Sequence, residues 1–559
     1  MTPSDPGRDG QPALPAPGAA PPDAASSGVA PAGNAGPQAS SGGWTVTAAR
    51  YAPAIAAAAA MAVAGVWGLA RDSAMGNDEV VSRWAALLSL RQLAHLLRHV
   101  DAVHGLYYLL LHGWMVVGTS PAVMRIPSVI SMAAAAAMLA VIGRRLTGSG
   151  WAGLFAGLIM ALTPGIIYYA QTARSYALVF ACVLAETLVL LHALQAERSG
   201  GTRAQVTRRW LAYGALVTLG GYLNEMALLV LAAHAITVLL ARYGRRAVAH
   251  WALAAAAGAI LVTPLIALSS RQQAALGAIP RPGLRDIWVL YHDYFGATIV
   301  APLLLAVCAV IALLPPRGWR RPDGTPAAAV AEPGSAWWNS GGISLPSVAA
   351  PLLVVPAALL ILESLVASPL YIDRYVLYGE AGAALLAGAG LYRIGQWLGD
   401  RAHRRALIWV PGVAVCVCAL LLQLGPQQRV RTPGSRLFNF GGPAQYVAAH
   451  ARRGDGVLFF SAFFRKARLG YPGDFSQTTD FALAVPPVVA NPFRGIDKPV
   501  STVLPLMLSY QRVWVIGSQP SASLPAGPVR DESAVLLHDF SRVAARAYRG
   551  MWVTLWLRD

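Results

Sequence analysis

The sequence contains few charged residues and almost no lysine. Charged side chains make up 13% of its 559 residues, and Lys466 and Lys498 are the only lysines among 44 basic residues. Soluble globular domains usually carry about 25% charged residues, so this composition excludes an ordinary soluble protein. The hydrophobic fraction of 56% instead predicts a polytopic α-helical membrane protein.

Cysteine is also scarce. The four cysteines, Cys182, Cys308, Cys416 and Cys418, lie inside apolar runs without disulfide or zinc spacing, so we interpret them as small buried hydrophobic residues. The net charge of +18 comes from arginine clusters between apolar runs, with no aromatic-interleaved basic face. This pattern argues against a nucleic-acid partner.

Residues 1–43 lack large apolar side chains and are rich in Pro, Ala, Gly and Ser. Such a segment cannot bury enough surface to fold, so we expect a disordered cytoplasmic tail. It shows no signal-peptide pattern, and the first apolar run is therefore expected to remain as a membrane anchor.

The next part of the chain, residues 44–425, is expected to form a transmembrane domain in the plasma membrane. It holds about eleven apolar stretches near the roughly 20 residues that a span needs. Arginine clusters fall in alternate loops, which the positive-inside rule places in the cytoplasm. The opposite loops, which include 71–121, 171–175, 269–296 and 368–376, then lie on the outer face together with the C-terminus.

Residues 426–559 have a different pattern. The apolar runs GVLFF, RVWVIG and MWVTLWLR predict strands, and AQYVAAHARR and ESAVLLHDFSRVAARAY predict helices. Alternation of the two predicts a small extracytoplasmic α/β domain. It contains no Gly-rich phosphate loop or metal-ligand cluster, so we interpret it as a lid or acceptor-docking module rather than a second enzyme.

The first outer loop, 71–121, is too long to be a simple connector. It begins with the acidic pair Asp78 and Glu79, continues with VSRWAALLSLRQLAHLLRHV, and then reaches Asp101. The long stretch is typical of an interfacial amphipathic helix or helix pair, and the apolar run after Asp101 is interfacial or re-entrant. The acidic pair alone is equally consistent with a helix N-cap.

Two other outer segments, AQTARSYAL and SPLYIDRYVLYGE, place Arg174 and Arg374 beside tyrosines at a membrane boundary. Interfacial anchoring is an open alternative for both arginines. Carboxylates facing arginines at one membrane surface nevertheless predict a site that deprotonates a nucleophile and stabilises an anionic leaving group.

The ordered set NDE, HGLYYLLLHGW, MRIPSVI, GRRL, AQTARSYAL and DRYVLYG resembles the GT-C superfamily of membrane glycosyltransferases. The resemblance is to bacterial members related to dolichyl-phosphate-mannose protein mannosyltransferases, glycosyltransferase family 39, and covers about residues 51–400. It implies a GT-C domain that moves a sugar, mannose by default, from a polyprenyl-phosphate donor to a hydroxyl of a glycan, lipid or protein on the outer face, with inversion. The composition hints at an actinobacterial source.

The resemblance also implies roles for individual residues. Asp78 would be the base, Glu79 a second candidate, and Asp101 a further acidic position, while Arg374 and Arg174 would bind the donor phosphate. The expected cavity residues are His104, Tyr107, Tyr176, Tyr375, His292 and Asp293. No organic cofactor is expected, and Mg²⁺ or Mn²⁺ bound through oxygen ligands remains open.

Two other classes of function remain open. A secondary transporter or flippase of lipid-linked or small polar substrates would place ionisable residues near mid-bilayer, and Glu186 and Glu363 do lie in apolar runs. The sequence shows no clear internal repeat, however, and most acidic residues of the membrane part gather at its outer boundary. A non-catalytic protein that binds lipid-linked sugars would keep the fold without the base.

Overall fold

The computed structural model describes residues 41–71, 74–272, 279–314, 342–490 and 493–559, apart from 522 and 525. The chain forms two units, Met1–Ala48 and Ala49–Asp559, and the description below concerns the second. Of the predicted tail, residues 1–40 lie outside the described residues.

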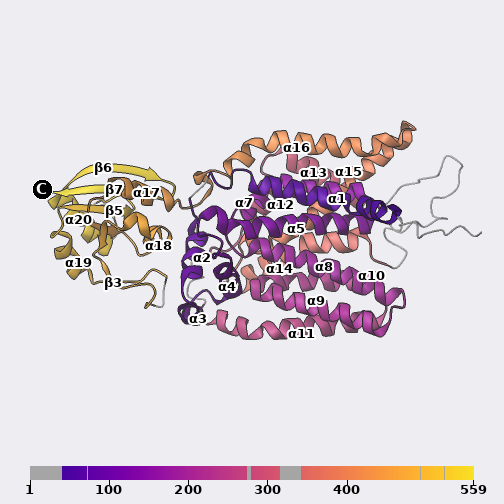
Figure 1. Ribbon diagram of the computed structural model, residues 1–559, viewed down its shortest axis with the longest axis horizontal. Coiled ribbons are helices and arrows are strands. Elements are labelled where there is room, and N and C mark those ends of the chain that lie inside the picture. Colours follow the sequence, from indigo (N-terminus) through magenta and orange to yellow (C-terminus); the bar gives the residue numbers. More distant parts are fainter. Residues whose placement is uncertain are drawn as a thin grey trace, which may run out of the picture. The chain divides into compact units, whose positions relative to one another are not determined.

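The described residues up to Arg429 form helices joined by loops, without strands. They are α1 (Ser41–Val66), α2 (Asn77–Leu87), α3 (Leu90–His99), η1 (Ala102–His104), α4 (Gly105–Trp114), α5 (Pro121–Thr147), α6 (Gly150–Leu162), α7 (Pro164–Ala170), α8 (Tyr176–Arg198), α9 (Arg203–Leu223), η2 (Glu225–Leu229), α10 (Val230–Ala241), α11 (Arg245–Ser270), α12 (Leu284–Phe295), α13 (Val300–Leu313), α14 (Leu345–Val366), η5 (Asp373–Gly379), α15 (Glu380–Arg401), η6 (Arg405–Trp409) and α16 (Val410–Arg429). Figure 1 shows α5, α8, α9 and α11 as neighbouring, nearly parallel rods.

Among the described residues, five helices are long and apolar enough to cross a bilayer: α5, α8, α11, α14 and the η6–α16 segment. Two bent pairs, α6 with α7 at 72° and α12 with α13 at 79°, raise the number to seven if each pair is one span. The predicted polytopic helical class is confirmed, whereas the number eleven stays a prediction. Helix α12 occupies part of the segment 269–296 that the sequence assigns to an outer loop.

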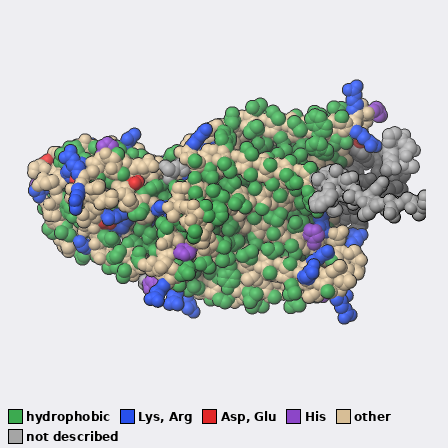
Figure 2. Space-filling view, in the orientation of Figure 1, with side chains coloured by type: hydrophobic (Ala, Val, Ile, Leu, Met, Phe, Trp, Pro, Cys, Tyr) green, Lys and Arg blue, Asp and Glu red, His purple; other side chains and the backbone are tan. Residues whose placement is uncertain are grey.

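The surface of the helical part suits lipid. On the face in Figure 2, hydrophobic side chains cover the region over the long helices, and arginines gather mainly toward the ends. Leu253, Ile260 and Leu421 are among the large apolar residues of the helical part that are exposed. Exposed apolar surface on this scale is costly in water but not in a bilayer.

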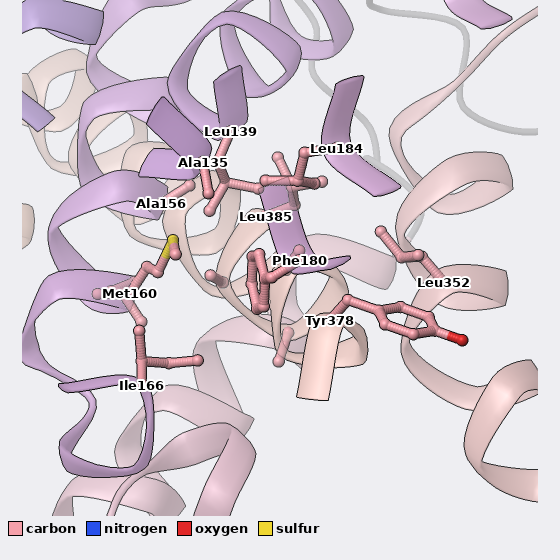
Figure 3. Packing of buried hydrophobic residues seen from close by; sticks show 14 of the residues in the cluster. Ala135, Leu139, Ala156, Met160, Ile166, Phe180, Leu184, Leu352, Tyr378 and Leu385 are labelled. Atoms are coloured by element: carbon pink, nitrogen blue, oxygen red, sulfur yellow. The ribbon is translucent and has the colours of Figure 1, made fainter. Parts of the chain in front are cut away.

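The interior of the helical part is filled by side chains from many helices. Figure 3 shows Ala135, Leu139, Ala156, Met160, Phe180 and Leu385 packed together, with Tyr378 beside Leu352. The small residues allow close approach of α5, α6 and α15, which fixes the ends of these helices relative to one another. The segment with Asp78 and Asp101 leads into α5 and η5 leads into α15, whereas Arg174 lies between α7 and α8.

Of the two predicted alternatives for the segment 71–121, one amphipathic helix or a helix pair, the structure has the pair, α2 and α3. The break between α2 and α3 lies at Leu88 and Ser89, where the Ser89 hydroxyl accepts a hydrogen bond from the Gln92 backbone N–H. A Ser N-cap with Gln three residues later is a capping box, and it starts the new helix.

The C-terminal part is the predicted α/β domain. Its mixed sheet has the order β2-β1-β5-β7-β6, with β1–β2 and β1–β5 parallel and the other pairs antiparallel. The elements are η7 (Pro433–Ser435), α17 (Gly441–His450), β1 (Asp455–Phe459), α18 (Lys466–Gly470), η8 (Pro472–Phe475), β2 (Thr478–Asp480), β3 (Leu483–Val485), β4 (Ile496–Asp497), α19 (Val500–Met507), β5 (Arg512–Gly517), α20 (Pro528–Asp539), β6 (Phe540–Tyr548) and β7 (Met551–Arg558).

One helix prediction in this domain is wrong in part. The stretch ESAVLLHDFSRVAARAY is helical only to Asp539, and its second half is the edge strand β6. Strand β6 pairs with β7 along its whole length, so ladder hydrogen bonds and the short turn at Arg549 and Gly550 override the helical preference of the alanines.

Candidate active site

Asp78 lies in the first turn of α2 with its side chain 28% exposed. Its Oδ1 accepts a hydrogen bond from Asn77 Nδ2 at 3.1 Å, and its Oδ2 lies 3.6 Å from Nη2 of Arg374. A carboxylate in the first turn is also favoured by the helix dipole. Asp78 is therefore held as an anion that remains accessible at the surface of the site.

Arg374 comes from η5, far along the chain. Its Nε donates a hydrogen bond to the Tyr176 hydroxyl at 2.8 Å, and its guanidinium carbon lies 5.6 and 5.9 Å from the ring centroids of Tyr176 and Tyr375. The two rings fix the guanidinium plane by cation–π contact. One side of Arg374 thus faces Asp78 and the other is fixed by tyrosines.

Asp101 and Arg174 form a second ion pair close by. Arg174 is 6% exposed, its Nη2 lies 3.3 Å from Oδ2 of Asp101, and its Nη1 donates to the Tyr108 hydroxyl at 2.6 Å and to Ser82 Oγ at 3.3 Å. The Tyr108 hydroxyl also donates to Asp101. Asp101 has φ of 59°, a left-handed conformation that Asp tolerates better than most residues.

Glu79 points in another direction from Asp78. It is 1% exposed, and it forms a two-pronged ion pair with Arg125, whose Nε and Nη2 donate at 2.8 and 3.0 Å. The backbone N–H groups of Ala173 and Gly76 donate to it at 3.0 and 3.2 Å. Glu79, rather than Asp78, therefore caps the N-terminus of α2, and both carboxylate oxygens of Glu79 accept hydrogen bonds.

Arg436 adds a contact from the C-terminal part of the chain. Its Nη1 lies 3.6 Å from Glu79 and donates to Thr172 Oγ1 at 2.8 Å, and its Nη2 donates to the Gln171 carbonyl oxygen at 2.8 Å. Glu79 and Arg436 thereby join α2, the 171–175 segment and the C-terminal domain.

The charges of the site shift several pKa values. Burial raises the pKa of Asp78, but Arg374, Arg174, His104 and Lys466 oppose it and lower the pKa to about 2. Burial also raises the pKa of Asp101, but Arg174, His104 and the hydrogen bond from Tyr108 outweigh it and lower the pKa below its usual range. Both carboxyls are consequently ionised at neutral pH.

His104 is neutral in this environment. Burial, reinforced by Arg174, lowers its pKa to about 3. Its Nδ1 lies 3.1 Å from Ser175 Oγ, and its ring packs edge-on against Tyr176 and at a tilt against Tyr108. A neutral imidazole has one donor and one acceptor nitrogen, and because Nδ1 is taken by Ser175, Nε2 is the nitrogen left for a further partner.

The structure places the other expected cavity residues differently. Tyr176 and Tyr375 lie beside Arg374, whereas the hydroxyl of Tyr107 is buried without a hydrogen-bond partner among the described residues. Its neighbour Tyr108 makes the polar contacts instead.

His292 and Asp293 lie on α12, beside this cluster rather than within it. His292 Nδ1 lies 2.9 Å from the Gly296 carbonyl oxygen at the end of its own helix, and Asp293 shares a hydrogen bond with Asp373, the residue before Arg374. The outer side of α12 lines an apolar groove of about 450 Å³, formed by Leu284, Ile287, Trp288, Tyr291, His292, Ile299 and Leu303.

The residues do not fit a metal site. The described part of the chain contains no group of three or more His, Cys, Asp or Glu side chains that could hold an ion. Asp78 and Asp101 face Arg374 and Arg174 instead of one another's oxygens. Both carboxylates are already paired with arginines, and no step below uses a metal.

Several residues of the site have no signal in the sequence that separates them from ordinary ones. Arg125 stands in the quoted run MRIPSVI, where a lone arginine at the start of an apolar helix is the available hint. Arg436, Lys466 and Asn77 come together only through the docking of the C-terminal domain, so sequence spacing cannot indicate them.

Comparisons with known proteins bear on the fold that carries this cluster. Residues 103–267 match the family model described as dolichyl-phosphate-mannose-protein mannosyltransferase. A search of curated proteins finds no match. Two solved structures of ArnT from Cupriavidus metallidurans, one in the apo state and one bound to undecaprenyl phosphate, align at 14% and 13% identity, each with a TM-score of 0.53. Each alignment covers 92% of this chain and 98% of the other, which shows a shared fold.

Proposed function

We propose that this chain, a protein with the GT-C fold that resembles glycosyltransferase family 39, is a membrane glycosyltransferase that uses a polyprenyl-phosphate sugar. The acceptor is a hydroxyl group on the outer face of the membrane, and mannose is the default sugar. The observation that carries the proposal is the cluster in which a partly exposed carboxylate, Asp78, lies against Arg374, with Arg174 and Asp101 adjacent.

Arg374 and Arg174 are suited to the donor phosphate. Arg374 is held by Tyr176 and its side chain is 30% exposed, which leaves charged N–H groups for phosphate oxygens. Arg174 is 6% exposed and held by Tyr108 and Asp101, so it adds positive charge behind that surface. The apolar groove on α12 and α13 suits the first isoprene units, because α12 packs against η5, which carries Arg374. Undecaprenyl phosphate is bound in one of the ArnT structures that share this fold, which supports a polyprenyl donor.

Asp78 is the proposed base. As the acceptor oxygen attacks the anomeric carbon, the bond from that carbon to the phosphate oxygen breaks and the hydroxyl proton passes to Asp78. The polyprenyl phosphate leaves with its electron pair as an anion, and the arginines stabilise the added charge. In-line displacement inverts the anomeric carbon.

Binding of the donor also prepares the base. In the free protein Arg374 lowers the basicity of Asp78. When a phosphate takes the guanidinium, that lowering effect is partly cancelled, and Asp78 becomes a better proton acceptor. The geometry therefore favours a base that becomes effective once the donor is bound.

Glu79 and Asp101 receive supporting roles in this proposal. Glu79 fixes the start of α2 through Arg125 and Arg436, so that Asp78 is presented to the site. Asp101 holds Arg174 through an ion pair shared with Tyr108. Asp78 is the most exposed of the three carboxylates, with its side chain 28% exposed against 18% for Asp101 and 2% for Glu79.

The test is transfer of labelled mannose from synthetic polyprenyl-phosphate-mannose by the purified protein in lipid, beside Asp78→Asn and with an EDTA arm. We expect release or transfer of label by the wild type only, and no loss in EDTA. Binding of polyprenyl phosphate without any turnover, for every lipid-linked sugar tried, would contradict the enzyme assignment and favour a carrier or transporter.

A further inference from the structure

Lys466 reaches α2 from the C-terminal domain. It begins α18, it is 5% exposed, and its Nζ donates a hydrogen bond to Oδ1 of Asn77. Asn77 in turn donates from Nδ2 to Oδ1 of Asp78 at 3.1 Å. Two consecutive hydrogen bonds thus connect the C-terminal domain to the proposed base.

Other contacts already dock α18 on α2. The Met75 backbone N–H donates to the Tyr471 hydroxyl at 2.8 Å, and Arg83 Nη1 donates to the Gly470 carbonyl oxygen at 2.9 Å. Lys466 adds a buried ammonium that has no carboxylate within salt-bridge distance among the described residues; its other contact is the ring of Phe463, 4.6 Å from Nζ. A buried charge paired only with a neutral amide and a ring is expensive as a docking device.

The surroundings of Asp78 show what this charge contributes. Arg374 faces Asp78 from η5, Arg174 from the 171–175 segment, His104 from η1 and Lys466 from α18. Arg374 faces Oδ2, whereas Asn77 holds Oδ1. The Lys466 ammonium fixes which way the Asn77 amide points and polarises it, because donors in a chain of hydrogen bonds strengthen one another.

We propose that Lys466 is a positioning residue of the transfer reaction, which acts through Asn77 to hold the carboxylate of Asp78 in its reactive orientation. The inference rests on the function proposed above. Under this proposal the C-terminal domain must be docked for efficient transfer, and it does more than cover the site.

The first test compares Lys466→Met with Lys498→Met. Lys498 is the only other lysine, and its Nζ donates to the Phe481 carbonyl oxygen within the same domain. We expect Lys466→Met to lower kcat about 10–100-fold, because the base would be misplaced by a fraction of an ångström. The KM for the donor and the thermal unfolding temperature should stay close to those of Lys498→Met. Asn77→Ala should give the same loss, and adding Lys466→Met to it should cost little more.

The second test measures how kcat depends on pH, because a lysine with a purely structural role would not change this pH profile. Burial lowers the pKa of Lys466 to about 8, and the charges of Arg494 and Arg174 add to this effect. The carboxylates of Asp78 and Asp101 act in the opposite direction. The ammonium is therefore lost as pH rises through this value, and wild-type kcat should fall there. Lys466→Arg keeps its charge, so it should retain most activity and lose this alkaline limb.

The outcomes separate the two proposals. No transfer by the wild type overturns both. Two outcomes in a wild type that does transfer the sugar overturn the role of Lys466 alone. One is an equal rate for Lys466→Met and Lys498→Met. The other is a double variant in which the losses from Asn77→Ala and Lys466→Met simply multiply.

Discussion

Arg374 Nη2 lies 3.6 Å from Asp78 Oδ2, although the two residues are almost three hundred positions apart in the chain. The pair is formed by two loop segments, the start of α2 and the turn η5, which the core helices bring together. It is partly open to solvent, since the two side chains are 30% and 28% exposed. An open ion pair of this kind can exchange partners when an anionic ligand arrives.

Replacement of Arg374 by Ala should weaken donor binding and slow transfer. A charge-assisted hydrogen bond contributes about 1.5–3 kcal/mol, which corresponds to roughly a 10–150-fold loss in kcat/KM for the donor. Binding of polyprenyl phosphate, measured by calorimetry in lipid nanodiscs, should fall in parallel. Arg91→Ala is the matched control, because Arg91 is an exposed arginine of α3, in the segment that follows Asp78. Equal binding by both variants would reassign Arg374 as an interfacial anchor.

Asp78→Asn should abolish transfer and leave the fold intact. The amide keeps the shape and the contact with Asn77 but cannot accept the hydroxyl proton, so we expect a loss of about 10²–10⁴-fold in kcat. Binding of polyprenyl phosphate should be unchanged or tighter, because Arg374 no longer has a carboxylate competitor. Asp400→Asn, at an exposed position near the end of α15, serves as the control. A large drop in donor binding with Asp78→Asn would argue against its role as the base.

Hydropathy and charge predict the membrane class, the amphipathic helical stretch within 71–121 and the α/β domain, because these depend on local composition and periodicity. They also select the loops that form the site: Asp78, Asp101, Arg174 and Arg374 come from three segments predicted to share one face, and the structure brings them together. The division of labour between Asp78 and Glu79 was beyond sequence reasoning. It depends on Arg125 and Arg436, which reach Glu79 from 46 positions away and from the C-terminal part of the chain.

Glu79→Gln should destabilise the protein more than it impairs the chemistry. The change leaves Arg125 and Arg436 buried without their counter-charge, and breaking a buried pair costs about 3–5 kcal/mol. We expect a clear drop in thermal stability in detergent, with a rate per folded molecule well above that of Asp78→Asn. In the double variant with Arg125→Met the loss should be smaller than the sum, because the orphaned charge is removed. A stable Glu79→Gln protein without activity would instead place Glu79 in the chemistry.

The pH profiles of kcat and kcat/KM should show that donor binding raises the pKa of Asp78. Burial raises the pKa of Asp78, but Arg374 and Arg174 outweigh it and set the pKa to about 2 in the free protein. A base works only when deprotonated, so activity is lost as pH falls through its pKa. The kcat/KM profile reports the free enzyme and should stay flat on the acid side down to about pH 4, whereas the kcat profile reports the donor complex.

In that complex the phosphate neutralises Arg374, the pKa of Asp78 rises, and the acid limb of kcat should begin at a higher pH than that of kcat/KM. Arg374→Ala removes the same cation without a donor, so its kcat/KM profile should acquire an acid limb at higher pH than the wild type. Arg91→Ala should keep the wild-type profiles. Coincident acid limbs for kcat and kcat/KM in the wild type would show that the donor phosphate does not displace the Arg374 contact, and the arginine would then serve the base in both states.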